Sequence, residues 1–357
     1  EEGLRKLVYS ITNESHPNPF GALAVKGLLE RILYGRYMIE QEMAKKPWIE
    51  DQRIEQPVFI IGMPRTGTSI LHAILHEDPA HRSPLAWECL LPYPAATPET
   101  FKDNAQFRTI EKEFGQLFKL VPDFQRKHYM AVDSPQECLG ITAFDFNSFQ
   151  FSAQLYLPSY MKWFSDDSDM LGTMRFHKRF LQYLQSGGVK SERWLLKSPV
   201  HLRRLDEIFE VYPDARIIMT HRGPSDIVSS TASLISSVRT LYSDREDPNV
   251  TGQEQAMLWS KYFDRFIESR KALGKEDQII DLKFEDFVVD QLGTIRKIYE
   301  RFGWDLSEEA VKNFEGFLAE NPREKHGKHE YSLDNFGLKE DEVNRQFSRY
   351  LEFYQQL

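Results

Sequence analysis

Cysteine and long apolar runs are both scarce in this sequence of 357 residues. Only Cys89 and Cys138 occur, with no C-x-x-C pair, so neither a zinc site nor a disulfide framework is expected, and a single disulfide stays open. No run reaches the roughly 18 apolar residues of a spanning helix, and the start, EEGLRKLVYS, is unlike a signal peptide. We therefore expect no stable membrane insertion and a cytoplasmic location. Because the chain starts without methionine, the alternative is a lumenal domain cut from its anchor.

An excess of basic residues is missing too. The chain has 45 Lys and Arg against 54 Asp and Glu, a net charge of -9. This balance argues against a nucleic-acid partner and leaves room for a local basic pocket. With 41% hydrophobic and 28% charged residues, the composition is that of an ordinary globular protein. It leaves the oligomeric state open.

The phosphate-loop pattern G-x-x-x-x-G-K-[ST] occurs at residues 62–69, GMPRTGTS, without its lysine. Thr68 stands in the place of the lysine, and the cation of the loop is Arg65. Gly62 and Gly67 allow a tight turn whose N–H groups can face an anion, and Thr68 with Ser69 opens a helix whose N-terminus favours negative charge. The missing lysine argues against a P-loop kinase or NTPase. A plain glycine turn between a strand and a helix is the simpler alternative.

Short apolar strands alternate with helical segments along the chain. Strand patterns occur at residues 57–61, 193–198 and 215–222 and within 277–287, each followed by apolar residues at helical spacing. This alternation predicts an α/β fold: one P-loop-like domain over residues 1–357, with a central parallel sheet flanked by helices. The expected parts are an N-terminal helical segment at 1–55, the loop unit at 56–75, a helical insertion at 101–185, the second half of the sheet at 193–305, and a C-terminal loop and helix at 320–357.

Three segments together resemble motifs of sulfotransferases that use 3′-phosphoadenylyl sulfate (PAPS), above all the bacterial and tyrosylprotein branches. They are GMPRTGTS at 62–69, WLLKSPVHL at 194–202 and HRGPSDIVSS at 221–230. The resemblance implies that the first is the 5′-phosphosulfate loop, whose cation reaches the sulfate. The loop residues that it implies as donor contacts are Pro64, Arg65, Thr66, Gly67, Thr68 and Ser69.

The other two motifs place further cations at strand ends. In the family, an arginine followed eight residues later by a serine binds the 3′-phosphate, which implies Arg222 and Ser230. An arginine fork suits a terminal phosphate. The family lysine that touches the leaving oxygen and the sulfuryl group corresponds to Lys197. The simpler alternatives are a surface arginine beside a bystander serine, and a solvated lysine at a strand end.

Two weaker likenesses complete the expected donor site. Phe284 in KFEDF aligns with a family aromatic beside the adenine, although a packed core residue fits equally well. HGKHEYSL at 326–333 resembles the basic loop over the 3′-phosphate, with a solvated turn as its rival. This loop implies Arg323, Lys325 and Lys328. The co-substrate would be PAPS, the product adenosine 3′,5′-bisphosphate, and no metal is expected.

Sulfuryl transfer needs a group that takes the proton of the acceptor. Glu88, 23 residues after Arg65, ranks first, because the tyrosylprotein branch has its glutamate base nearby. His128 ranks second. Glu137 and His201 are the other candidates, and Pro199 stands where cytosolic members have their histidine base.

The acceptor is the least defined part of the prediction. Residues 144–164 are dense in aromatics and could line an apolar pocket, but aromatics at helical spacing usually form core. No extended basic run suggests an anionic polymer. We expect a sulfotransferase that modifies a hydroxyl or amine of a small or lipid-like acceptor by in-line displacement. The rivals are a P-loop kinase or NTPase and a non-catalytic nucleotide-binding module on the same fold.

Overall fold

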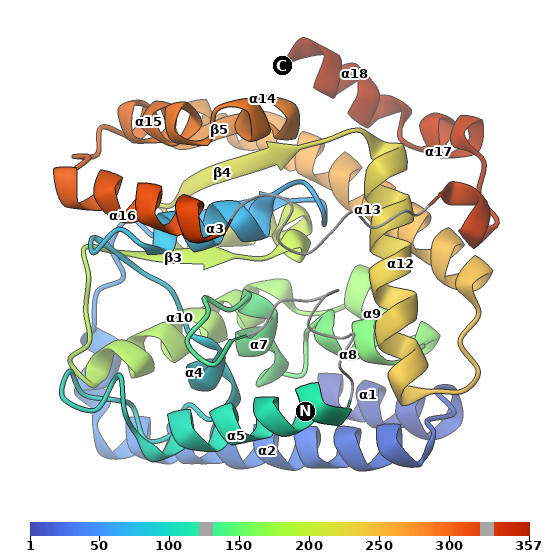
Figure 1. Ribbon diagram of the computed structural model, residues 1–357. Helices are drawn as coiled ribbons and strands as arrows, with labels where there is room; N and C mark the ends of the chain where they lie inside the picture. The colour runs from blue at the N-terminus through green and yellow to red at the C-terminus, as the bar shows by residue number, and fades with distance from the viewer. Residues whose placement is uncertain (121–130, 322–331) are drawn as a thin grey trace. The chain divides into compact units, whose positions relative to one another are not determined.

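The strand patterns of the sequence form one sheet. The computed structural model describes residues 1–120, 131–321 and 332–357, and within them lie β1 Val58–Gly62, β2 His81–Arg82, β3 Arg193–Lys197, β4 Arg216–His221 and β5 Ile279–Lys283. These described strands have the order β2-β3-β1-β4-β5. Figure 1 labels β3, β4 and β5. Strand β1 pairs in parallel with β3 and β4, and β4 pairs in parallel with β5. The predicted α/β class with a central parallel sheet is confirmed.

The strand register brings four loops to the same edge of the sheet. Ile60 lies opposite Lys197, and Gly62 opposite Thr220. One strand further out, His221 lies opposite Lys283. The segments after β1, β3, β4 and β5 therefore leave from the carboxyl edge, where ligands of parallel α/β sheets bind.

The chain divides into two compact units. One comprises Glu1–Glu55, Arg82–Trp194 and Leu241–Asp244, and the other Gln56–His81, Leu195–Thr240 and Arg245–Leu357. The second unit holds most of the sheet. The single domain expected from the sequence stays a prediction.

The unit with most of the sheet packs helices on both sheet faces. Val58 and Ile60 of β1 share one apolar cluster with α3, α14, α15 and α16. Phe59 points to the other face, because side chains alternate along a strand, and its ring contacts His201 and Tyr212. The described helices of this unit are α3 Thr68–His76, η2 Pro199–Arg204, α11 Leu205–Val211, α12 Pro224–Tyr242, α13 Pro248–Leu273, η3 Glu276–Gln278, α14 Phe284–Val289, α15 Gln291–Phe302, α16 Glu308–Glu320, η4 Leu333–Phe336, α17 Glu340–Gln346 and α18 Ser348–Gln356.

The other unit is helical in its described residues and contains the segments 1–55 and 101–185, for which the sequence predicts helices. Helix α2 begins where Asn18 accepts a hydrogen bond from the N–H of Gly21 (2.8 Å). Helix α5 lies alongside α2 (Figure 1), and an ion pair of 2.7 Å between Arg31 and Glu113 links the two helices. Its described helices are α1 Glu2–Asn13, α2 Pro19–Lys45, η1 Pro47–Asp51, α4 Ala86–Leu90, α5 Ala105–Leu120, α7 Cys138–Ala143, α8 Gln150–Gln154, α9 Pro158–Asp166 and α10 Met170–Ser186.

Two local features complete the fold. The proline-rich stretch after β2 contains the short helix α4, where the carboxylate of Glu88 accepts from the N–H of Leu85 (3.1 Å). After β3, the chain forms the 3-10 helix η2 and continues as α11. Among the helices of the described ranges, none combines the length and apolarity needed to cross a membrane.

Candidate active site

The turn between β1 and α3 has a backbone that its glycines make possible. Gly67 has φ 87° and Arg65 φ 68°, both in the left-handed region. A Cβ on Gly67 would lie 2.9 Å from Cδ2 of Phe284, and one on Gly62 would lie 2.3 Å from Oγ1 of Thr220. Gly62 has φ 152°, so at both glycines the close approach and the backbone conformation disfavour a side chain.

A buried threonine pair fixes this turn to the next strand. The hydroxyl of Thr66 donates to the carbonyl of Met63 (2.8 Å) and lies 2.5 Å from the hydroxyl of Thr220 at the end of β4. These hydrogen bonds fix the turn to the end of β4. Helix α3 then begins at Thr68, and its first N–H groups and its dipole face the turn, an arrangement that suits an anion.

The loop cation meets a residue of the third motif. Nε of Arg65 donates to Oγ of Ser230 at 3.0 Å, although 165 positions separate the two residues. Ser230 lies on α12 and is buried. The predicted 5′-phosphosulfate loop and the predicted 3′-phosphate motif are therefore neighbours.

Lys197 lies at the end of β3 beside the same helix start. Its Nζ donates to Oγ of Ser69 at 3.2 Å, and its side chain is largely buried. Next to it on α3, Nε2 of His72 lies 3.3 Å from the carbonyl of Leu195. Burial, and after it the charge of Lys197, holds the pKa of His72 well below its usual value. A neutral histidine therefore lies beside this lysine.

Arg222 follows β4 and contacts the loop from its other side. Its Nη1 donates to the carbonyl of Arg65 at 3.2 Å, and its guanidinium lies 4.6 Å from the ring centroid of the half-buried Phe284. Its Nε and Nη2 donate to one carboxylate oxygen of Asp226, at 3.2 and 3.0 Å. The hydroxyl of Tyr350 is hydrogen-bonded to the backbone N–H and carbonyl of Arg222.

The sequence interpretation missed three of these partners: Thr220, Asp226 and Tyr350. The spacing of four from Arg222 was an available signal for Asp226, because residues four apart share a helix face. Nothing in the sequence marks Tyr350, which comes from the C-terminal helix, or Thr220 as part of the loop.

Of the base candidates, Glu88 lies in the helical unit. Its carboxylate accepts from Nη2 of Arg82 (2.7 Å) and from the N–H of Leu85 (3.1 Å), and its side chain is 1% exposed. Burial raises the pKa of Glu88, while Arg82 and the amide act against this rise. Glu137 is the half-buried N-cap residue of α7, and His201 is buried in η2 with its ring edge-on to Phe59.

Several predicted residues lie outside the part of the chain that the structure describes. They are His128, Arg323, Lys325 and Lys328. Pro64 is half-buried in the turn. The aromatic stretch 144–164 is largely buried within the helical unit, where Tyr160 stacks on Phe164 at 6.2 Å between centroids. Core packing accounts for these rings.

Fold and site together define a class of protein. Three cations, Arg65, Lys197 and Arg222, gather around a glycine turn and a helix N-terminus at the carboxyl edge of a parallel sheet. Such a site suits a ligand with more than one anionic group. This is a P-loop-like α/β protein whose loop carries arginine instead of lysine.

The comparison with protein families specifies this class further. Residues 57–308 match the model of the sulfotransferase family, and the chain belongs to this family. It is 23% identical over 328 residues to the omega-hydroxy-beta-dihydromenaquinone-9 sulfotransferase Stf3 of Mycobacterium bovis, covering 91% of this chain and 80% of that protein. The same-named protein of Mycobacterium tuberculosis matches equally.

Two solved sulfotransferases are similar over nearly their whole length. STF1 of Mycobacterium tuberculosis is 30% identical with a TM-score of 0.85, covering 97% of this chain and 91% of that one. STF9 of Mycobacterium avium is 28% identical with a TM-score of 0.90, covering 99% and 90%. The predicted fold and the predicted sulfotransferase class are confirmed. The chain is a sulfotransferase.

Proposed function

We propose that this sulfotransferase uses PAPS as donor and transfers its sulfuryl group to a hydroxyl of a small or lipid-like acceptor. The observation that carries the donor assignment is the meeting of motif residues from three distant segments. Arg65 bonds Ser230, Arg222 bonds the carbonyl of Arg65, and Lys197 bonds Ser69. A kinase-type phosphate site would not need this set, because its cation belongs at position 68.

The roles follow from charge and position. Sulfuryl transfer resembles phosphoryl transfer, a loose in-line displacement that depends on positioning and on charge stabilisation. In the proposal, Arg65 and Lys197 hold the sulfuryl oxygens and neutralise the charge that grows on the leaving phosphate. Pro64, Thr66, Gly67, Thr68 and Ser69 form the cradle for the 5′-phosphate. Arg222 and Ser230 bind the 3′-phosphate, and Phe284 faces the adenine.

We propose that one of four residues takes the proton of the acceptor hydroxyl. Glu88 ranks first, ahead of His128, Glu137 and His201. Its raised pKa suits a general base, because a base works best when its pKa is near the working pH. Its ion pair with Arg82 equally suits a structural role, so the two roles need separate measurements.

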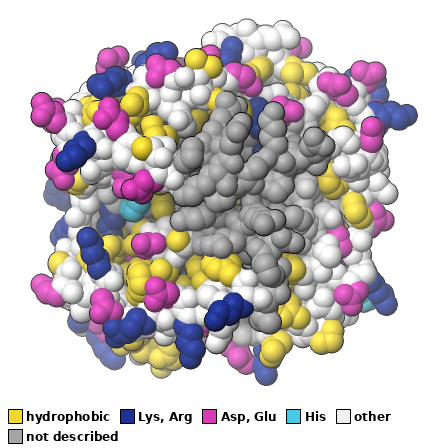
Figure 2. All heavy atoms as spheres, in the orientation of Figure 1, with side chains coloured by type: hydrophobic (Ala, Val, Ile, Leu, Met, Phe, Trp, Pro, Cys, Tyr) yellow, Lys and Arg dark blue, Asp and Glu magenta, His cyan; other side chains and the backbone are white. Residues whose placement is uncertain are grey.

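A lipid-like acceptor is supported by the relatives. The curated relative is named for a menaquinone derivative with an omega-hydroxyl group. On the face shown in Figure 2, Lys and Arg side chains of the described residues are interspersed with Asp and Glu. A mixed surface of this kind does not favour a long anionic polymer. A cytoplasmic location, the absence of a metal and a single domain remain predictions.

The donor proposal is tested by calorimetric titration without magnesium. Adenosine 3′,5′-bisphosphate, 5′-AMP and ATP are each titrated into wild type, Arg222→Ala and Arg296→Ala. Arg296 is an exposed residue of α15 and serves as a control for the loss of one positive charge. We expect the bisphosphate to bind best. Arg222→Ala should weaken it by about tenfold or more, because a charge-assisted hydrogen bond contributes about 1.5–3 kcal/mol.

Two outcomes would overturn this proposal: a preference for ATP, or equal binding of the bisphosphate and 5′-AMP.

Turnover is then measured with PAPS carrying radioactive sulfate and three acceptors: a long-chain omega-hydroxylated isoprenoid, a simple phenol and a sulfate-free polysaccharide. We expect label in the isoprenoid or the phenol. Lys197→Met should lower kcat by about a hundredfold or more, since removing one stabiliser of transition-state charge has that effect.

A further inference from the structure

The hydroxyl of Tyr350 holds both backbone groups of Arg222. It accepts from the N–H of Arg222 at 3.1 Å and donates to the carbonyl of the same residue at 2.7 Å, across 128 positions of sequence. Arg222 lies between the end of β4 at His221 and the start of α12 at Pro224. Arg222 therefore belongs to neither the strand nor the helix, and the hydroxyl of Tyr350 supplies hydrogen bonds of the kind that its backbone would make inside either element.

Helix α18 is docked so that this hydroxyl has a defined place. The ring of Tyr350 meets Phe263 of α13 edge-on at 4.2 Å between centroids and stacks on His221 at 6.2 Å. Tyr350 is 1% exposed. Its burial raises the pKa of its hydroxyl, so the group stays protonated and can donate and accept at once.

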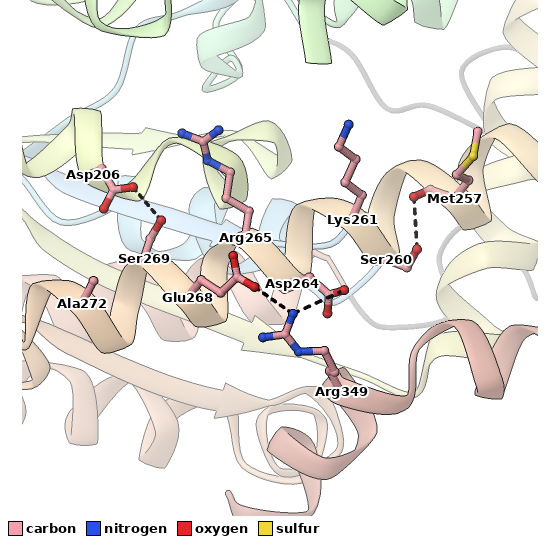
Figure 3. A pocket seen from close by; sticks show the side chains of 10 residues that line it. All are labelled: Asp206, Met257, Ser260, Lys261, Asp264, Arg265, Glu268, Ser269, Ala272 and Arg349. Carbon is pink, nitrogen blue, oxygen red and sulfur yellow. Dashed lines mark hydrogen bonds and ion pairs between the residues drawn. The ribbon is translucent and has the colours of Figure 1, made fainter. Parts of the chain in front are cut away.

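Arg349, the neighbour of Tyr350, links α18 to α13 by ion pairs. Nη1 of Arg349 lies 2.9 Å from Glu268 and 3.7 Å from Asp264, two acidic residues one turn apart on the same face of α13 (Figure 3). These three residues line a cavity of about 730 Å³. Helix α18 thus has an ion pair on its outer side and Tyr350 on its inner side.

We propose that Tyr350 is a positioning residue of the donor site, whose hydroxyl fixes the backbone of Arg222 so that its guanidinium is preorganised for the 3′-phosphate of the donor. The proposal rests on the proposed use of PAPS. A Cβ added to the next residue, Gly223, would lie in open space, with no atom within 4 Å among the described residues other than its chain neighbours. Without the hydroxyl, ordering Arg222 would cost free energy at the moment of binding.

The test compares Tyr350→Phe with Tyr354→Phe. Both remove one hydroxyl from α18, but that of Tyr354 donates to Glu285 (2.8 Å) and not to Arg222. Calorimetry measures the ratio of the affinities for adenosine 3′,5′-bisphosphate and 5′-AMP. We expect Tyr350→Phe to reduce this ratio by about tenfold, which corresponds to ~1.4 kcal/mol, with 5′-AMP binding within about twofold of wild type. Tyr354→Phe should keep the wild-type ratio.

Kinetics separates positioning from a general loss of structure. In Tyr350→Phe the KM for PAPS should rise about tenfold while kcat stays within about twofold, because the 3′-phosphate is bound equally in the ground and transition states. An unchanged affinity ratio in Tyr350→Phe overturns the role of Tyr350 while leaving the donor proposal intact. A wild-type protein that does not distinguish the bisphosphate from 5′-AMP overturns both.

Amide hydrogen exchange on the unmodified protein makes the test independent of how the variants fold. The Arg222 amide, bonded to the hydroxyl of Tyr350, should exchange slowly before any nucleotide is added. Fast exchange at this amide in the free protein would contradict the proposed preorganisation.

Discussion

Replacing Glu88 with glutamine separates two roles that one carboxylate can have. Glu88 is 1% exposed and Arg82 is 6% exposed, with 2.7 Å between Oε1 and Nη2. Arg82 also donates to the carbonyl of Val189 (2.8 Å) and lies 4.2 Å from the ring centroid of Trp194. Glu88→Gln keeps the size of the side chain and removes the negative charge, so the guanidinium of Arg82 stays buried without its counter-ion.

The size of the effect follows from burial. Removing one partner of a buried ion pair costs about 3–5 kcal/mol. The amide oxygen of glutamine can still accept one hydrogen bond, so we expect the free energy of unfolding to fall by about 3 kcal/mol. The matched control is Glu30→Gln, whose pair with Lys26 has side chains 67% and 72% exposed. Exposed pairs contribute about 0–1 kcal/mol. The difference between the two variants isolates the contribution of burial.

The free energy of unfolding is measured by urea denaturation, and kcat is measured at a temperature where the variant is folded. The double variant Arg82→Met/Glu88→Gln should recover most of the loss, since it removes the unpaired charge and leaves a thioether that packs on aromatic rings. A loss below about 1 kcal/mol in Glu88→Gln would refute the reasoning about the ion pair. For the chemistry, removal of a general base lowers kcat by roughly 10²–10⁴. A kcat within twofold of wild type would transfer that role to another candidate.

Three further predictions concern the donor site. Gly67→Ala places a Cβ 2.9 Å from Phe284 at φ 87°, so the free energy of unfolding in urea should fall by about 1–2 kcal/mol. Calorimetry should show weaker bisphosphate binding. Wild-type values in both measurements would contradict the strain argument. The pKa of His72 lies below its usual 6.5 in the folded protein, so the unfolded chain takes up the proton first as the pH falls. The stability that His72 contributes above about pH 6.5 is therefore lost below it, by at most about 1.4 kcal/mol per pH unit. His72→Gln should flatten the fall of Tm between roughly pH 6.5 and 5, and an unchanged slope would exclude His72 as its source. Asp226→Asn removes a carboxylate that competes for Arg222, so bisphosphate should bind more tightly, by no more than about fivefold because the pair is exposed; weaker binding would show that Asp226 orients the arginine instead.

The alternation of apolar strands and helices was sufficient to predict the sheet. Strands buried on both faces read as apolar runs, and those at Val58–Gly62 and Arg216–His221 lie within about one residue of the predicted ranges. The two-residue strand His81–Arg82 was not predicted. Its residues are polar, and its pairing depends on a neighbour over a hundred positions away, so no local pattern could indicate it.

The candidate site could be predicted as far as its residues belong to contiguous motifs. A glycine turn after a strand constrains its own backbone, so Gly62, Gly67 and Arg65 were recognisable together. The partners of these residues come from elsewhere: Thr220 supports the turn from β4, and Tyr350 holds Arg222 from the end of the chain. A single hydroxyl in an amphipathic helix has no sequence signature, because its meaning depends on which backbone group the fold brings to it. The residues proposed for the chemistry therefore belong to the motifs, while the residues proposed to preorganise them are identified only by the folded structure.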